Sequence, residues 1–320
     1  MHAASVTLLC WAMIGAACFV SEGASALMAV GLAALVAFVG LPHGAADRRF
    51  ARPRLEPTFG PWWGAVFLTG YVATASLVVL GWYAAPAATV VVFFLASAWH
   101  FGLEEPRFAI GPPAMRDVFD FARGGLVIWV AVAFQHEEVA RILLVTSPVE
   151  AEVSIEAAMT ILTYCSWCFL ALASVAWGLQ SLAAFASTGQ RRSVLLSDNA
   201  LVASMTLLFA VANPLISFLV YFCAWHSARG LRRLRRELGE SWLQLGKSLA
   251  PMTAAAVVLI ASLSVLLLRS TTVDGTLVRA TFVGLSAVAI PHLLLHGVAP
   301  LFKEREARAT QGVLSAGSPA

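Results

Sequence analysis

A succession of long apolar segments is the feature that most constrains what this chain can fold into. A membrane-spanning helix needs roughly 17–25 mostly apolar residues. Nine segments approach or exceed this length: 5–20, 26–42, 62–84, 86–102, 119–135, 158–187, 199–228, 248–268 and 276–299. Because hydrocarbon cannot hydrogen-bond backbone groups, such segments must form helices. The sequence therefore predicts an all-α fold, a polytopic transmembrane helix bundle with about eight spanning helices.

The composition excludes a water-soluble protein. Only 12% of the 320 residues are charged and 59% are hydrophobic, whereas a soluble domain carries about 25% charged residues. The apolar segments follow each other too closely for a separate soluble domain, so we expect a single transmembrane bundle over residues 1–302. Residues 303–320 are polar and rich in small residues, and we expect them to form a disordered cytoplasmic tail.

The basic residues indicate how the bundle is oriented. They cluster between apolar segments, as in "RRFARPR" (48–54) and "RGLRRLRR" (229–236). This distribution is typical of cytoplasmic loops and not of nucleic-acid binding. It predicts that both termini are cytoplasmic. The first segment lacks the positively charged start of a cleaved signal peptide, so we expect it to remain as the first helix.

This orientation creates a parity problem between Arg123 and Arg229. The chain must cross the membrane an even number of times between these two cytoplasmic residues, yet three apolar segments lie there. Segment 199–228 contains Asn213 and Pro214 near its middle, and proline kinks or breaks a helix. Segment 119–135 is short. One of these two segments is therefore expected not to make a simple crossing.

The histidines provide the main indication of function. Five of the seven lie in or at the ends of apolar segments, all toward the predicted cytoplasmic side: His43, His100, His226, His292 and His296. Ionisable groups inside a membrane are costly and usually functional. Imidazole binds iron, zinc, copper and nickel well. We therefore predict one metal site made by histidines from different helices.

Two carboxylates follow histidines at helical spacing. Asp47 comes four residues after His43, and Glu104 comes four residues after His100. Residues i and i+4 share one face of a helix, so each carboxylate is a candidate to accept the free ring N–H of its histidine where the helix continues that far. The alternative is that Asp47 and Glu104 are solvated carboxylates at the membrane interface. Glu105 is expected to face solvent. These spacings alone do not separate a non-haem metal from a haem, which needs two axial ligands.

Four short motifs carry a resemblance to a known family. They are "PHGAAD" (42–47), "WHFG" (99–102), "WHSAR" (225–229) and "PHLLL" (291–295). Their order and rough spacing resemble the Brp/Blh family of bacterial membrane carotenoid oxygenases. The resemblance implies non-haem Fe2+ held by His43, His100 and His226, with His292 in the last family motif. It implies no catalytic residues beyond the metal ligands and no other bound cofactor.

The resemblance also implies a reaction and a location. The protein would cleave β-carotene at its central double bond with O2, giving two molecules of retinal, in the bacterial inner membrane. The substrate is a lipid-soluble carotenoid that dissolves in the bilayer, so a lateral entrance between helices suits such a site. A retinal-binding rhodopsin would be a further partner, and the sequence leaves open whether one consumes the product.

The chain departs from the family at one position. The third family motif reads H-S-x-R-H, whereas this chain has Gly230 where the second histidine is expected. We expect His296, one turn after His292, to supply the replacement nitrogen. A weakened site, or action on another carotenoid, would also explain this departure. Two further alternatives concern the whole protein. One is a non-catalytic membrane protein of the same fold that binds carotenoid or assists retinal-protein assembly, and the other is a membrane cytochrome or transporter that shares the motifs by chance.

Overall fold

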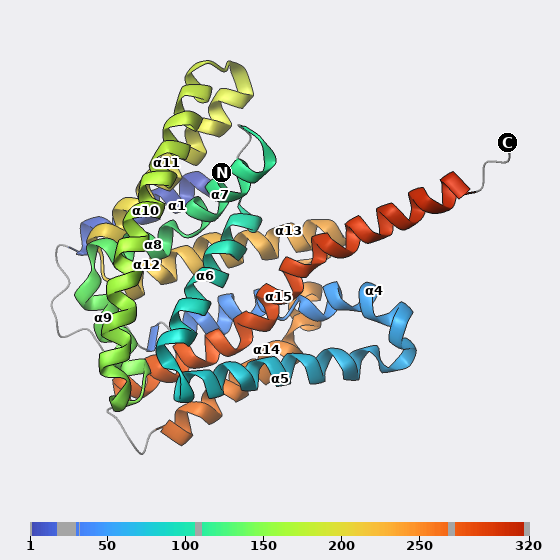
Figure 1. Cartoon of the computed structure of the whole chain (residues 1–320), viewed down its shortest axis with the longest axis horizontal. Helices are drawn as coiled ribbons and strands as arrows, with labels where there is room; N and C mark the ends of the chain where they lie inside the picture. Colours follow the sequence, from blue (N-terminus) through green and yellow to red (C-terminus); the bar gives the residue numbers. More distant parts are fainter. Residues whose placement is uncertain (1, 18–29, 32, 106–110, 268–272, 317–320) are drawn as a thin grey trace.

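The structure is a computed structural model that describes residues 2–17, 30–31, 33–105, 111–267 and 273–316. These residues hold helices and short connections but no strand, which confirms the predicted all-α fold. The helices form one bundle, and α15 continues from it as a long helix toward the C-terminus (Figure 1).

The elements have the following bounds in chain order: α1 (His2–Ala17), the π-helix η2 (Val36–Gly40), α3 (Leu41–Gly44), α4 (Asp47–Phe59), η3 (Gly60–Trp62), α5 (Trp63–Ala84), α6 (Pro86–Glu104), α7 (Pro113–Gly124), α8 (Leu126–Phe134), α9 (His136–Thr146), η4 (Val149–Ala151), α10 (Glu152–Phe185), α11 (Gly189–Val211), α12 (Pro214–Leu219), the π-helix η5 (Val220–Ser227), α13 (Ala228–Leu238), α14 (Trp242–Leu267) and α15 (Val273–Ala316).

Six helical segments in the described part of the chain are long and apolar enough to cross a membrane. They are Ala33–Ala84, Pro86–Glu104, Glu152–Phe185, Gly189–Val211, Trp242–Ser262 and Gly275–Gly297. A shorter apolar helix covers Ala3–Ala16. The chain is therefore a multi-pass membrane protein. The number is about six and not the eight that we predicted, because segment 5–20 forms only the shorter helix, segments 26–42 and 62–84 fall within the one stretch Ala33–Ala84, and segment 119–135 yields no helix long enough. Two of the predicted segments are broken into shorter helices.

The first of these is segment 119–135. It divides between the amphipathic α7 and the short apolar α8, which meet at Gly125. The side chain of Trp129 fills the space beside this residue, where a Cβ on Gly125 would lie 2.2 Å from Trp129 Nε1. Glycine thus lets the chain change direction here. The nine residues of α8 are too few to span a membrane alone.

The second is segment 199–228, which the structure divides at Asn213 and Pro214. The Asn213 side chain caps α12 by accepting a hydrogen bond from the backbone N–H of Leu215, at 2.9 Å. The chain also turns sharply here. Ser217 Oγ donates a hydrogen bond of 3.1 Å to the carbonyl oxygen of Leu208, nine residues earlier. The sequence left open which of the two segments does not make a simple crossing, and the structure breaks both of them.

The helices that matter for function pack together through close backbone contacts. A Cβ on Gly124 of α7 would lie 2.1 Å from the backbone nitrogen of Gly102 in α6. Between η2 and η5 the close contact is with a side chain: a Cβ on Gly40 would lie 2.4 Å from a ring carbon of Phe222. Gly124 therefore allows α6 and α7 to approach through their backbones, and Gly40 leaves room for the Phe222 ring between η2 and η5.

Helix α15 occupies the middle of this arrangement. It packs against α5, α6, α9 and α14, and most of its residues from Thr276 to Leu293 are buried or half-buried. Beyond this part it runs on to Ala316, within the segment 303–320 for which we predict a disordered tail. The division into a bundle and a tail stays a prediction.

Candidate metal centre

Four histidine side chains from four elements meet inside the bundle: His43 of α3, His100 of α6, His226 of η5 and His292 of α15. Going round this cluster, the ring centroids are 4.9 Å apart for His43 and His226, and 5.3 Å apart for His226 and His100. They are 4.9 Å apart for His100 and His292, and 5.2 Å apart for His292 and His43. Residues up to 249 positions apart in sequence thus form one compact group of imidazoles.

Ring nitrogens of three of these histidines, His43, His100 and His292, are available to a metal ion. His100, His226 and His292 are between 2% and 6% exposed. Within the described residues, Nε2 of His43, Nε2 of His292 and both ring nitrogens of His100 are buried without a hydrogen-bond partner. One nitrogen from each of the His43, His100 and His292 rings lies within 4.8 Å of the others, and His226 is not in this group. Buried polar atoms are normally satisfied, so this group fits a divalent metal that prefers nitrogen ligands.

Asp47 lies directly behind the cluster. It is fully buried, and its Oδ1 accepts a hydrogen bond of 2.7 Å from His292 Nδ1. A carboxylate only accepts, so the proton resides on Nδ1 and Nε2 is left free to bind a metal. This corrects our prediction, which paired Asp47 with His43. The physical reason is that the helix does not continue between them: α3 ends at Gly44 and α4 begins at Asp47.

His296 and Glu104 lie on the margin of the site. His296 Nε2 is 3.4 Å from Asp47 Oδ1, and its ring centroid is 4.4 Å from that of His292. Asp47, His292 and His296 thereby form a second group of candidate ligands that shares His292 with the first. Glu104 approaches His296 Nδ1 at 3.9 Å, so its histidine neighbour is His296 and not the predicted His100.

Glu105 is not the solvated side chain that we expected. Its carboxylate accepts hydrogen bonds from Trp225 Nε1 at 2.7 Å and from the Arg229 guanidinium at 2.9 Å. The guanidinium also lies over the Trp225 ring and donates to the backbone carbonyl of Glu104. These contacts tie the end of α6, just after His100, to the residues that flank His226. They hold two of the four histidines in place relative to each other.

Gly230 has a clear steric role. A Cβ at this position would lie 2.3 Å from Cε1 and 2.4 Å from Nδ1 of His43. The imidazole of His43 therefore occupies the space beside the Gly230 backbone. A side chain on residue 230 would collide with His43 unless that ring moved.

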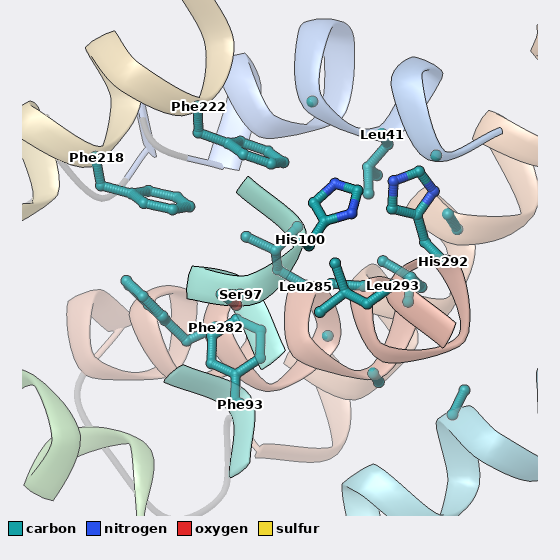
Figure 2. Close-up of a pocket in the computed structure, with 18 of the residues that line it drawn as sticks. Leu41, Phe93, Ser97, His100, Phe218, Phe222, Phe282, Leu285, His292 and Leu293 are labelled. Carbon is teal, nitrogen blue, oxygen red and sulfur yellow. The ribbon is translucent and has the colours of Figure 1, made fainter. Parts of the chain in front are cut away.

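A large apolar cavity adjoins the four histidines. Its volume is about 750 Å³, and His43, His100, His226 and His292 all contribute to its wall. Figure 2 shows the rings of His100 and His292 beside Leu41 and Leu293, with phenyl rings extending away from them. The lining contains no Asp, Glu, Lys or Arg among the described residues. Such a cavity suits a long uncharged hydrocarbon.

A row of three stacked rings in the cavity wall ends at His226 of the histidine cluster. Phe218 and Phe222 are stacked with centroids 5.1 Å apart and planes 9° apart. Phe222 is in turn stacked on His226, at 6.1 Å and 16°. The three rings therefore present nearly parallel faces along one side of the cavity. A planar conjugated molecule fits beside such a row of rings.

Two π-helical segments position histidines, and nothing in our sequence reasoning identified them. η2 directly precedes the short α3 that carries His43, and η5 contains His226. A π-helix widens the turn and changes the direction of the following side chains, and such segments are frequent at functional sites. Gly40 and Asn213–Pro214 are the nearest local signals, but they do not specify a π-helix.

Comparisons with known proteins agree with this geometry. A family model described as Beta-carotene 15,15'-dioxygenase matches residues 33–298, a range that includes all five predicted ligand histidines. The chain is also similar to a Beta-carotene 15,15'-dioxygenase from uncultured marine bacterium 66A03. The two are 26% identical over 274 residues, which cover 82% of this chain and 90% of that relative. No solved structure matches the chain.

Proposed function

The chain belongs to the beta-carotene 15,15'-dioxygenase family, and from this premise we propose that it cleaves β-carotene at its central double bond with O2, giving two molecules of retinal. It is a carotenoid dioxygenase embedded in a membrane. The observation that carries the proposal is the contact between a large apolar cavity and four clustered imidazoles, three of which are buried. The cavity is apolar, like the substrate, and the imidazole nitrogens can bind a metal ion.

We propose non-haem Fe2+ as the metal and His43, His100, His226 and His292 as its ligands. Zinc has no redox chemistry, whereas a dioxygenase must activate O2, so iron is preferred among the metals that bind imidazole. When bound, Fe2+ with positions free of protein ligands supplies O2 activation. Asp47 keeps the proton on His292 Nδ1, and its negative charge offsets part of the metal charge in a low-dielectric setting.

The remaining side chains of the site position the polyene. The stacked rings of Phe218 and Phe222 lie along the cavity wall next to His226 and would hold a conjugated chain straight. The apolar lining excludes water from the reacting double bond. These side chains need not exchange protons with the substrate. The proposed reaction cleaves one carbon–carbon double bond and places one atom of O2 on each of its two carbons.

His296 was predicted as a replacement for the ligand missing at position 230. Its Nε2 lies beside Asp47, at 3.4 Å from Oδ1. This contact favours a role in orienting Asp47 over a position among the four rings. We therefore propose that His296 contributes less to metal binding than any of the four clustered histidines.

The test is expression in a bacterial host that accumulates β-carotene, with retinal and residual β-carotene measured by chromatography. Iron in the purified protein is measured by elemental analysis. We expect the wild-type protein to bleach the cells, to form retinal and to carry iron. His100→Ala should lose both iron and retinal formation, whereas His296→Ala should keep most of the iron.

Three results would contradict parts of this proposal. Orange cells without retinal or another apocarotenal, despite protein in the membrane, would exclude β-carotene cleavage and favour a binding or assembly role. Iron retained in His100→Ala would exclude the proposed ligand set. An equal loss of iron in His296→Ala and His100→Ala would make His296 a ligand, as the sequence had led us to expect.

The predicted location follows from the same premise. We propose the bacterial inner membrane, with both termini cytoplasmic, because the basic clusters flank the helix ends near the histidines. Retinal formed there is released into the bilayer, where a retinal-binding rhodopsin would take it up. That partner stays a proposal based on the chemistry of the product.

A further inference from the structure

We propose that the carotenoid reaches the histidine cavity from the side, through a portal between α5 and α14 that opens into the lipid. This inference rests on the proposed function and adds the route by which the substrate arrives. It starts from one property of the cavity. Some residues of its wall are also exposed on the outer surface of the bundle, and such residues mark where the cavity opens.

The first edge of the portal is a stripe on α5. Four residues of this helix line the cavity and are also exposed: Leu68, Val72, Ser76 and Leu80. They follow each other at intervals of four, which places them on one helix face. With a rise of 1.5 Å per residue, the stripe is about 18 Å long. Leu68, Val72 and Leu80 are 52%, 54% and 61% exposed, so these side chains reach the surrounding lipid.

The second edge is a matching stripe on α14. Ala255, Leu259 and Ser262 line the cavity and are exposed, at intervals of four and three. Every exposed lining residue in the described part of the chain belongs to one of these two stripes. The opening therefore lies between two particular helices and is not spread over the surface.

The floor of the portal is α15, which packs against both α5 and α14. On the α5 side, the Tyr71 hydroxyl donates a hydrogen bond of 2.7 Å to the carbonyl oxygen of Val288. On the α14 side, Gly284 allows Ile260 to approach so closely that a Cβ on Gly284 would lie 2.6 Å from Ile260 Cγ1. Leu285, Val288 and, one turn further on, His292 of α15 line the cavity along this floor. A molecule that enters along this floor arrives at His292.

The chemistry of the two stripes suits a long apolar polyene and not a water-borne ligand. Five of the seven residues are aliphatic, and the two serines carry the only polar side-chain atoms of the set. Exposing aliphatic side chains to water costs free energy, whereas exposing them to lipid does not. β-Carotene dissolves in the hydrocarbon of the bilayer, so a lateral opening lets it reach the histidines without crossing an aqueous phase.

The test compares phenylalanine substitutions at the portal with matched substitutions on the same helices. Ser76→Phe and Ala255→Phe place a bulky ring in the opening. Ala73→Phe and Ala254→Phe place the same ring on neighbouring exposed positions that do not line the cavity. Metal-free protein is placed in liposomes without O2, and β-carotene is delivered from donor vesicles. Quenching of tryptophan fluorescence reports the rate of binding without any cleavage.

We expect the two portal variants to bind β-carotene about ten-fold more slowly than wild type, since a barrier raised by roughly 1.4 kcal/mol has this effect. The two matched variants should bind at the wild-type rate. Iron uptake by all four variants should equal that of wild type, which shows that the histidine cluster has kept its fold.

Other results separate the portal from the proposed function. Equal binding rates in portal and matched variants would overturn the portal, even where wild type cleaves β-carotene. A wild-type protein that binds β-carotene through the portal but forms no retinal would overturn the function and leave the portal standing. Absence of β-carotene binding by wild type would overturn the portal as well.

Discussion

A single buried carboxylate, Asp47, determines how one of the proposed ligands presents its free nitrogen. The hydrogen bond from His292 Nδ1 to Asp47 Oδ1 is 2.7 Å long, and both side chains are buried. An ionised acceptor in this position makes the imidazole a stronger ligand and keeps its ring in one orientation. The same carboxylate is approached by His296, so it connects the margin of the site to its centre.

Replacing Asp47 with asparagine should weaken metal binding by about 10–100-fold, the usual effect of losing a carboxylate behind a metal-binding histidine. The amide keeps the size of the side chain but loses its charge, and it can present an N–H to His292 in place of an acceptor. Iron affinity measured by competition with a chelator tests this expectation.

Glu104→Gln is the control for Asp47→Asn, because Glu104 approaches a histidine only at 3.9 Å and is partly exposed. It should change iron affinity little. Equal effects of the two substitutions would mean that overall negative charge, and not the hydrogen bond to His292, supports the metal.

Gly230→Ala should lower the iron content of the purified protein. The added methyl group would lie 2.3 Å from His43 Cε1, so the imidazole must move away from its position beside His226. Gly230→His should lower iron content further, although it restores the histidine of the related motif. Overpacking of this kind also costs roughly 1–3 kcal/mol of stability.

Gly246→Ala is a matched control for Gly230→Ala, since nothing lies within 4 Å of a Cβ at position 246. Its iron content should equal that of wild type. A higher iron content in Gly230→His than in wild type would show that His43 can move aside and that position 230 can supply a ligand.

At the scale of elements, backbone contact between helices holds the site together. Gly102 follows His100 by two residues, and its backbone lies against Gly124 at the end of α7. The contacts of Glu105 with Trp225 and Arg229 then connect the same end of α6 to η5 and α13. The position of His100 therefore depends on two neighbouring elements as well as on its own helix.

Gly124→Ala should destabilise the protein, because its Cβ would meet backbone atoms of α6 that cannot rotate away. Forcing such a group into a packed interface costs roughly 1–3 kcal/mol. The melting temperature in detergent should fall accordingly, and retinal formation should fall with it as His100 shifts.

Gly178→Ala in α10 is the matched control for Gly124→Ala, since a Cβ there meets nothing within 4 Å. It should leave the melting temperature unchanged or slightly higher, because alanine is the better helix former. An equal loss of stability in the two variants would show that close packing of α6 on α7 is not the cause.

At the scale of the whole molecule, the cavity and the histidines lie within a bundle whose ends differ in charge. The α4 segment before α5 and the α13 segment before α14 are rich in arginine. Ala85, which joins α5 to α6, lies at the opposite end of α5 from α4. The arginine-rich segments are expected on the cytoplasmic side and Ala85 on the outer side.

Cysteine labelling tests this orientation in a background with Cys165→Ser and Cys168→Ser, which removes the two exposed cysteines of the described chain. Ala85→Cys should react with a membrane-impermeant maleimide in intact spheroplasts. Ser241→Cys, between α13 and α14, should react only after lysis. The reverse pattern would invert the orientation and place both termini outside.

The sequence by itself determined the class of the fold and the identity of the histidines that meet. Apolar length and the distribution of arginine are properties of the linear chain, so they predict helices in a membrane without knowledge of contacts. Five histidines predicted on one side of the membrane were therefore recognisable as a group before any helix was placed. The family was recognisable for a similar reason, since each of its motifs is a few consecutive residues.

Only the tertiary structure decided how those histidines are supported and where the proposed portal lies. Asp47 bonds a histidine 245 residues away instead of the one at helical spacing, because the helix ends between α3 and α4. The π-helices, the break at Asn213 and the portal likewise depend on contacts between distant segments. Local spacing predicts which residues are neighbours on one helix, whereas these features depend on how several helices pack against each other.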